Sequence, residues 1–405
     1  MSSSINNGNS YVEFTESNLK ISFKDIIHND KSFVNQWLSN PNQLNYDRKL
    51  FIPYNGTNIN SHIKNDYFNT FNGYNININE PVPEDYLTII KPYLKVVKEL
   101  CEGDNNYFDY YINYISHIIQ FPNYKREVAV FFRGEQGIGK NLHLEAISNI
   151  IGSNYYLTTN KSDDLFGKFA CDVSTKLIVN WNEADKIGNL IEDLKIFITE
   201  EIKVSEQKCK NKIETRNIST LIGTTNRLCP LPLEQGSRRF AIFQATDKML
   251  KQKYIDNDFF AKLANLIKTP IFIASLYKYL NERDLSNYNY KLFPKNTKAY
   301  VQIKQLSMPY EISFLIELLN TVKDTISIKG SDLFAQYNMY CDSSKLKNEV
   351  SNKIFFARLE NHKLGGSCIK SIKHHAIYYT INSKLLHPKL IELGFINNDE
   401  YLFID

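Results

Sequence analysis

A glycine-rich segment that ends in lysine is the part of the sequence best suited to chemistry. It follows the pattern GxxxxGK, which is typical of loops that bind the phosphates of a nucleotide. Glycine lets such a loop turn its backbone N–H groups inward, and the helix that follows adds the positive end of its dipole. The residues predicted to hold ATP are Gly134, Glu135, Gln136, Gly137, Ile138, Gly139, Lys140 and Asn141. We expect the Lys140 amine to contact the β- and γ-phosphates.

The flanking residues supply the strand and the helix that this pattern requires. Residues 128–132 are a continuous apolar run of the kind buried in a parallel sheet, and residues 141–151 are expected to form a helix that Gly152 ends. This context favours nucleotide binding over the alternative, a glycine-rich turn with an exposed lysine.

Two side chains are candidates for binding Mg²⁺. Asn141 stands where most such loops carry Ser or Thr, and its amide oxygen is a hard neutral donor. Glu183 follows a second predicted strand, residues 177–181, which we expect to lie beside the strand of the phosphate loop. Its carboxylate would polarise the water that attacks the γ-phosphate and help to hold the metal. Asp185 is either a second anion near the site or an exposed loop acid.

A third predicted strand, residues 218–224, leads to Asn226, whose amide can hydrogen-bond the γ-phosphate or the attacking water. The alternative is an ordinary turn asparagine. Arg238 and Arg239 follow, where a further predicted strand, residues 239–243, begins. One of them is predicted to reach the γ-phosphate of a neighbouring subunit as an arginine finger, and either could instead make a structural ion pair.

Two basic regions are candidates for DNA binding. Residues 202–215 alternate as a β-hairpin does, with Lys208, Lys210 and Lys212 at the tip. Lysines there suit contacts with DNA phosphates, although lysine also keeps an edge hairpin soluble. Residues 345–384 hold eight Lys or Arg and two Glu, a net +6, and the rest of the chain has 40 against 42, a net −2. The C-terminal residues predicted to contact DNA are Lys347, Arg358, Lys370 and Lys373; the alternative is a solvated face.

The order of elements predicts an α/β fold. The strands and helices of residues 126–250 alternate, which is typical of a doubly wound parallel sheet of the P-loop, AAA+-like kind. Helices are expected at residues 311–322, 331–341 and 348–361, with Ser331 as an N-cap, and strands at 368–372 and 376–381. Three helices and a terminal hairpin describe a winged helix. On its third helix, Lys347, Ser351, Arg358 and His362 are expected to share one side, away from Val350, Ile354 and Ala357.

Composition excludes several classes of protein. The six cysteines are scattered without a CxxC pair, which argues against a disulfide framework or a cysteine zinc site. No run approaches ~18 apolar residues, and the N-terminus lacks a basic start and an apolar stretch. We therefore expect an intracellular protein with no membrane partner.

The ordered motifs resemble the superfamily 3 helicase module. They are GEQGIGKN, VNWNEAD, the lysine-tipped hairpin, LIGTTN and SRRF, and with the segment around Trp37 and residues 67–73 they extend the resemblance over about residues 35–245. The sequence is most similar to primase-associated helicases of phages, plasmids and large DNA viruses, including the poxvirus-type primase–helicases. In that group, Asn after the P-loop lysine and an Asn-Glu pair in the second motif are familiar variants.

The resemblance implies a homo-hexameric ring that binds ATP and Mg²⁺ between subunits and moves 3′→5′ along single-stranded DNA at a replication fork. It implies that Lys140 binds phosphate, Glu183 activates water, Asn226 senses the γ-phosphate and Arg238 or Arg239 acts in trans. Lys208 or Lys210 is favoured as the DNA-touching tip. We expect too little room for a full primase ahead of the helicase and do not predict primer synthesis. The alternatives that stay open are a primase or polymerase on a separate chain, as a partner, and a lost upstream portion. The setting would be DNA replication in the host cytoplasm or a viral factory.

These considerations divide the chain into six predicted regions. They are a disordered tail (1–10), a linker-like region such as precedes these helicases (11–83), a helical collar-like segment (84–125), the ATPase core (126–250), a helical connection (251–308) and a winged-helix domain (309–405). Two other functions use the same parts. One is an ATPase that melts or loads an origin without processive unwinding, and the other is a catalytically weak DNA-binding scaffold.

Overall fold

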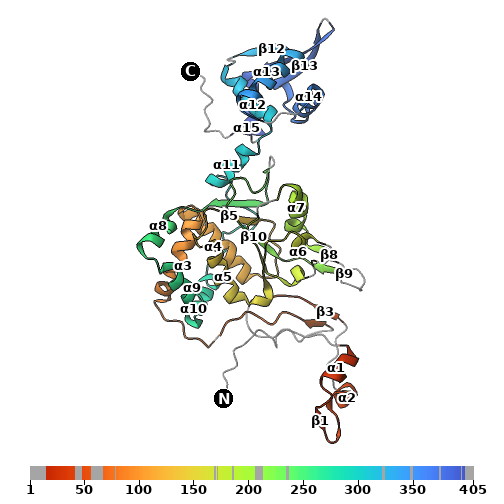
Figure 1. The fold of residues 1–405 in the computed structure, drawn as a ribbon, viewed down its shortest axis with the longest axis vertical. Coiled ribbons are helices and arrows are strands. Elements are labelled where there is room, and N and C mark those ends of the chain that lie inside the picture. Colours follow the sequence, from red (N-terminus) through yellow and green to blue (C-terminus); the bar gives the residue numbers. More distant parts are fainter. Residues whose placement is uncertain are drawn as a thin grey trace. The chain divides into compact units, whose positions relative to one another are not determined.

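Two units make up the chain, and each is described by itself (Figure 1). The first comprises residues 1–230 with 239–299, and the second comprises residues 231–238 with 300–405. The structure, a computed structural model, describes residues 15–41, 48–55, 67–77, 79–167, 170, 172–184, 187–205, 213–233, 237–321, 324–346, 350–373, 375–393 and 395–396. The tail expected at residues 1–10 lies outside the described residues.

A five-stranded parallel sheet forms the centre of the first unit. Its strands are β5 (Ala129–Arg133), β6 (Tyr156–Thr159), β7 (Ile178–Trp181), β10 (Thr220–Thr225) and β11 (Phe240–Gln244), in the order β11-β5-β10-β7-β6. Every residue of β5, β7 and β10 is buried, as expected for strands covered on both faces. The predicted α/β core with a parallel sheet is therefore confirmed.

One predicted neighbour in this sheet is wrong. We expected β7 to lie beside β5, but β10 lies between them and pairs with both. Gly223 of β10 is in register with Phe131 on one side and with Trp181 on the other. The sequence order of the strands could not reveal this insertion, because it depends on pairing between distant segments.

Helices cover both faces of the sheet (Figure 1). On one face, Phe132 packs edge-on against Tyr111 and His143. This face is covered by helices that share one hydrophobic core with it: α3 (Tyr86–Leu100), α4 (Asn105–Gln120), α5 (Lys140–Ile151), α9 (Phe259–Leu266) and α10 (Pro270–Asn281). On the other face, Phe166 at the end of α6 (Asp163–Phe166) packs against Trp181 and against Phe197 of α7 (Ile191–Thr199). The sheet is thus doubly wound, as predicted.

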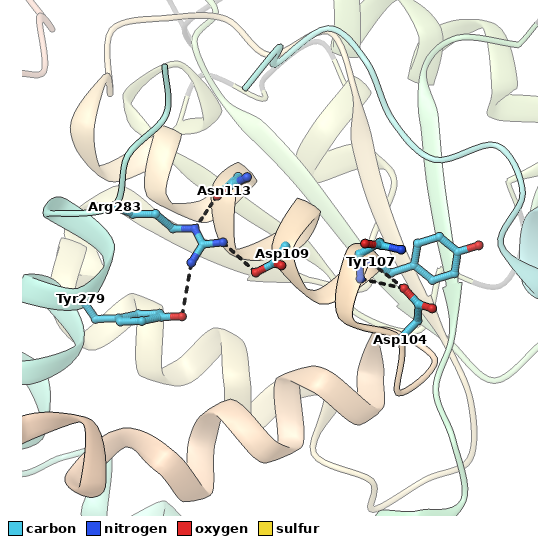
Figure 2. Close-up of polar contacts among 7 residues, drawn as sticks. Asp104, Tyr107, Asp109, Asn113, Tyr279 and Arg283 are labelled. Atoms are coloured by element: carbon cyan, nitrogen blue, oxygen red, sulfur yellow. Dashed lines mark hydrogen bonds and ion pairs between the residues drawn. The ribbon is translucent and has the colours of Figure 1, made fainter. Parts of the chain in front are cut away.

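Polar contacts hold α4 at its start and near its middle (Figure 2). At its start, Asp104 Oδ1 accepts hydrogen bonds from the backbone N–H groups of Asn106 and Tyr107, at 2.7 and 3.1 Å, as an N-cap does. Further along, Arg283, which follows α10, donates to Asp109 Oδ1 at 2.7 Å and to the Asn113 side chain. The helices expected to form a collar are therefore joined to α10 within the first unit.

The remaining elements of the first unit are short, apart from α8. They are α1 (Glu16–Ser22), β1 (Ile27–His28), β2 (Lys31–Ser32), α2 (Phe33–Leu38), β3 (Arg48–Leu50), β4 (Tyr67–Asn69), β8 (Ile202–Ser205), β9 (Ile213–Arg216) and α8 (Lys248–Ile255). Strands β8 and β9 pair antiparallel, so the two arms of the predicted hairpin are confirmed, while its tip lies outside the described residues. Among the described residues, no single helix has the length and apolar character to cross a membrane; α9 and α10 meet that test only as a pair bent by 81°.

The second unit combines helices with a three-stranded antiparallel sheet. Its order is α11 (Lys298–Leu306, which begins in the first unit), α12 (Tyr310–Thr321), β12 (Thr325–Lys329), α13 (Gly330–Ser343), α14 (Asn352–Asn361), β13 (Cys368–Lys373), β14 (Ala376–Asn382) and α15 (Ser383–Glu392). The sheet has the order β12-β14-β13. The three expected helices and the terminal hairpin are present, whereas β12 and α15 were not predicted.

Two details of the second unit differ from expectation. Helix α13 begins at Gly330, with Lys329 at the N-cap position, so Ser331 is not its N-cap. On α14 the buried side chains are Phe355 and Leu359, while Ile354 is 47% exposed. Phe355 stacks within an aromatic core, and this packing determines which side of the helix faces inward. His362, expected on the polar side, is instead half-buried against Glu311, with 2.9 Å between Nε2 and Oε1.

Gly223→Ala tests the packing that places β10 beside β5. A Cβ at this position would lie 2.3 Å from Phe131 Cε1, in a fully buried part of the sheet. We expect the substitution to lower the free energy of unfolding by about 1–3 kcal/mol, measured by chemical denaturation. The control is Gly188→Ala, where an added Cβ has no atom within 4 Å. Equal stability of the two variants would contradict this packing.

Candidate nucleotide-binding site

The glycine-rich loop lies at the carboxyl end of β5, directly before α5. Gly134, Gly137 and Gly139 have φ angles of +157°, +80° and +93°, values that favour glycine. A Cβ on Gly139 would lie 2.7 Å from Val96 Cγ1 of α3. The loop therefore needs glycine both for its backbone conformation and for its close approach to α3.

The backbone of this loop has hydrogen-bond donors to spare. Among the described residues, the N–H groups of residues 135–139 donate to no backbone carbonyl. Gly139 is the N-cap residue of α5, which runs for 12 residues and directs the positive end of its dipole toward the loop. Unpaired amides at a helix N-terminus suit an anion, and the fit of this loop to a phosphate chain is good.

Lys140 joins two of the predicted motifs. Its Nζ donates to the carbonyl of Glu135 at 2.7 Å, to Asn226 Oδ1 at 2.7 Å and to the carbonyl of Gly134. Burial lowers the pKa of Lys140 to about 8, against the opposing pull of the Glu135 and Glu183 carboxylates. The ammonium group is thus held by oxygen atoms at the position where phosphate oxygens would take their place.

Asn182 connects three elements at this edge of the sheet. Its Oδ1 accepts hydrogen bonds from Asn141 Nδ2 of α5 and from Thr224 Oγ1 of β10, both at 3.0 Å. The sequence interpretation treated Asn182 only as a variant of an acidic residue and did not single out Thr224. Both roles depend on β10 lying beside β7.

Glu183 occupies an unusual backbone position after β7. Its φ is +53°, in the left-handed region that residues other than glycine rarely adopt, and its side chain is exposed. The turn is held on both sides, because the N–H of Asn182 donates to the Thr159 carbonyl at 2.8 Å and that of Ala184 donates to the Thr224 carbonyl at 2.9 Å. The carboxylate is therefore presented to solvent by a fixed turn. Asp185 lies outside the described residues.

The oxygen donors present suit a partly hydrated Mg²⁺. Asn141 uses its Nδ2 in the bond to Asn182, which leaves its amide oxygen outside this contact. Glu183 adds an exposed carboxylate. Within the described part of the chain, no group of three His, Cys, Asp or Glu residues could hold a metal. A cation here would take one or two protein oxygens and complete its shell with phosphate and water, as Mg²⁺ commonly does.

Arg238 and Arg239 lie at the opposite edge of the sheet from the loop of their own chain. Strand β11 runs parallel to β5, with Phe240 opposite Ala129 at the amino end and Gln244 opposite Arg133 at the carboxyl end. Five strand residues separate the two edges by roughly 16 Å. The Arg239 carbonyl accepts the Ala129 N–H at 2.8 Å, and Arg238 is exposed. The Arg239 backbone thus lies at the amino end of β11, away from the phosphate loop of its own chain.

Arg133 is a further residue that sequence reasoning missed. It is buried at the carboxyl end of β5, where it donates from Nε to the Gln244 side chain and from a terminal nitrogen to the Leu228 carbonyl at 2.6 Å. Burial lowers its pKa. The sequence does contain a signal for Arg133: it is a charged residue that ends an otherwise apolar run, immediately before the glycine-rich loop.

The structure describes only some of the predicted DNA contacts. Lys208, Lys210, Lys212 and Lys347 lie outside the described residues. Arg358 is exposed near the end of α14, and Lys373 is exposed at the end of β13. Lys370 is half-exposed and bonds Glu360 Oε1 at 2.9 Å. The described residues thus leave Arg358 and Lys373 as the more accessible cations of this group.

The fold and the loop define a P-loop-like α/β protein, and comparison with known proteins extends this description. Residues 132–239 match the profile of a family of unknown function, DUF5906. The chain is 27% identical over 203 residues to the DNA primase-polymerase of Nitratiruptor phage NrS-1, which covers 47% of this chain and 27% of that protein. The chain therefore spans about a quarter of the length of this relative.

Solved structures show the same fold. The apo structure of the NrS-1 C-terminal region superposes with a TM-score of 0.63 and 18% identity, covering 91% of this chain and 90% of that one. A second apo structure of this region, the A form, gives 0.60 and 17% identity over 82% and 84% of the two chains. The chain thus shares its architecture, beyond the glycine-rich loop alone, with the NrS-1 C-terminal region.

The lowered pKa of Lys140 predicts how nucleotide affinity depends on pH. Above pH 8 the free protein holds this amine neutral, so binding of a triphosphate must take up a proton. We expect the affinity for a non-hydrolysable ATP analogue to fall by up to about tenfold per pH unit between pH 8 and 10, measured by calorimetry. Arginine stays charged in this range, so Lys140→Arg is the control and should show a shallower dependence. A flat profile for the folded parent protein would contradict the assignment.

Proposed function

We propose that this protein is an ATP-dependent replicative DNA helicase of the superfamily 3 kind. The observation that carries the proposal is the convergence of three motifs at one edge of the sheet. Lys140 of the glycine-rich loop bonds Asn226 after β10, and Asn141 and Thr224 both bond Asn182 after β7. Lys140 and Asn226 are 86 positions apart in the sequence, and Asn141 and Asn182 are 41 apart. We propose that these residues surround a bound triphosphate.

In this proposal each side chain has a separate task. Lys140 and the amides of residues 135–139 bind the phosphate chain, and Asn226, already within hydrogen-bond distance of Lys140, contacts the γ-phosphate. Glu183 orients and polarises the attacking water. Bound Mg²⁺, near Asn141 and Glu183, would neutralise charge on the phosphates. These roles follow the arrangement at the carboxyl ends of β5, β7 and β10.

Completion of this site requires a second copy of the chain. Because Arg239 lies at the amino end of β11, an arginine finger supplied by Arg238 or Arg239 would come from another subunit. Contacts of this head-to-tail kind close into rings, and the resemblance to superfamily 3 suggests a hexamer. The greater exposure of Arg238 favours it as the finger.

In this proposal, DNA is bound by the second unit and by the lysine-rich residues between β8 and β9. The order of helix, strand, two helices and hairpin in the second unit is typical of a winged helix. The net +6 of residues 345–384 and the lysine-rich residues between β8 and β9 suit single-stranded DNA at a fork. The longer phage relative is named a primase-polymerase, so we propose a primase or polymerase as a partner and DNA replication in a host cell as the setting. Membership of the poxvirus-type group stays a prediction.

Two substitutions at the loop and β7 test ATP hydrolysis. Lys140→Ala removes the cation that binds phosphate, and Glu183→Gln keeps the shape of the side chain but not its basicity. We expect turnover to fall about 100-fold or more in both, while only Glu183→Gln retains nucleotide binding. The control is Lys262→Ala, because Lys262 is an exposed lysine on α9. Parental turnover in both variants would refute the site.

Mixing experiments test the arginine finger. Lys140→Ala subunits retain the arginine, and Arg238→Ala subunits retain the loop. If the finger acts in trans, a mixture of the two inactive variants should regain measurable ATP turnover, because some interfaces then hold both intact parts. Arg239→Ala is compared in the same way. No recovery in either mixture would contradict a shared site.

Strand displacement on a forked substrate separates the proposed helicase from the other functions. A helicase displaces the strand with ATP, whereas an initiator or loader hydrolyses ATP without processive displacement. A scaffold binds DNA but shows no turnover stimulated by single-stranded DNA.

A further inference from the structure

The hairpin of β13 and β14 ends in an exposed pair of isoleucines. Ile372 and Ile377 are directly opposite each other in the antiparallel ladder, next to the last pair before the turn. Their exposed fractions are 76% and 44%, and no large hydrophobic side chain in the described residues is more exposed than Ile372. The two isoleucines thus place exposed apolar surface at the end of the hairpin.

The hairpin extends past its contacts with α14. On the same face, two residue pairs closer to the core, Tyr379 stacks on Phe356 of α14, with 4.4 Å between ring centroids and 9° between planes. Opposite Tyr379, Lys370 bonds Glu360 of α14. Side chains two positions apart on a strand share a face, so Ile372 lies on the same face as Lys370, beyond the residues that contact α14. The isoleucine pair therefore extends the buried face into solvent.

The surroundings of the pair are basic. Lys370 lies on the same face, and Lys373 extends from the last residue pair on the other face. Residues 345–384 carry a net +6, with the two glutamates at positions 349 and 360 as the only acids. An exposed aliphatic pair favours aggregation unless a partner covers it. The positive charge around the pair favours a negatively charged partner, such as a polyanion.

We propose that Ile372 and Ile377 form an apolar wedge that enters the base stack of DNA where the duplex is opened or bent. Aliphatic side chains insert between base steps in this way, while nearby cations hold the phosphates. Lys373 binds the adjacent backbone. The inference rests on the proposed function for the choice of DNA as the partner, but it requires neither ATP hydrolysis nor a ring.

The test is binding to forked DNA that carries 2-aminopurine at the junction, in the absence of nucleotide. The variant is Ile372→Thr with Ile377→Thr, because threonine keeps the strand propensity and removes most of the apolar surface. We expect affinity for the fork to fall on the order of tenfold, with loss of the fluorescence rise that reports unstacking and little change in salt dependence. Ile372→Thr alone should give an intermediate effect.

Two matched variants separate the wedge from a general effect of lost apolar surface or lost charge. Ile369→Thr removes an isoleucine that is 51% exposed on the other face of β13, and it should leave junction binding and fluorescence unchanged. Lys373→Gln should weaken fork and duplex binding alike and lower the salt slope by about 1. All variants are compared by thermal unfolding, so that a loss of fold is recognised.

Three outcomes would overturn the inference. They are parental fork binding and fluorescence in the double variant, an equal loss in Ile369→Thr, and a change of oligomeric state without a change in DNA binding, which would assign the pair to a protein interface. Failure of the proposed function is seen separately as absent ATP turnover in the parent protein. Junction unstacking can be measured even then.

Discussion

The insertion of β10 between the phosphate-loop strand and β7 is the constraint on which the candidate site depends. It brings Asn226 within 2.7 Å of Lys140 and lets Thr224 share Asn182 with Asn141. If β7 were paired directly with β5, no strand would lie between Lys140 and Asn182 to position Thr224 and Asn226. The insertion itself needs Gly223, since a side chain there would collide with Phe131. A buried glycine thus determines the polar geometry at the edge of the sheet.

Local patterns in the sequence predicted much of the fold. Continuous apolar runs located the strands around residues 128–132, 177–181 and 218–224, and the glycine spacing located the turn before α5, because both depend on neighbouring residues. The position of β10 between β5 and β7 and the buried side of α14 depend on contacts between distant segments, so the sequence alone misjudged them, and the contacts of Asn182 were not predicted. Strand β12 escaped notice because its run is short, with Ile326 and Ile328 as its only apolar residues. The lysines of the central hairpin remain predictions, since they lie outside the described residues.

The two units place different demands on their side chains. In the first, Lys140 and Arg133 are cations held by oxygen atoms, and burial lowers the pKa of each. In the second, exposed cations accompany exposed isoleucines on a hairpin, an arrangement suited to a flexible polyanion with flat apolar bases. In the proposed function, the first unit binds a small ligand and the second presents a surface to DNA.

Strand β11 has a mechanical consequence. Its first residue pairs with the start of β5 beside Arg239, and its last residue, Gln244, bonds Arg133 at the root of the glycine-rich loop. In a ring of the proposed kind, β11 would therefore connect the arginines that face a neighbouring subunit with the base of the glycine-rich loop of its own subunit. A displacement of Arg239 on contact with the neighbour would then reach that loop through a single hydrogen-bonded strand.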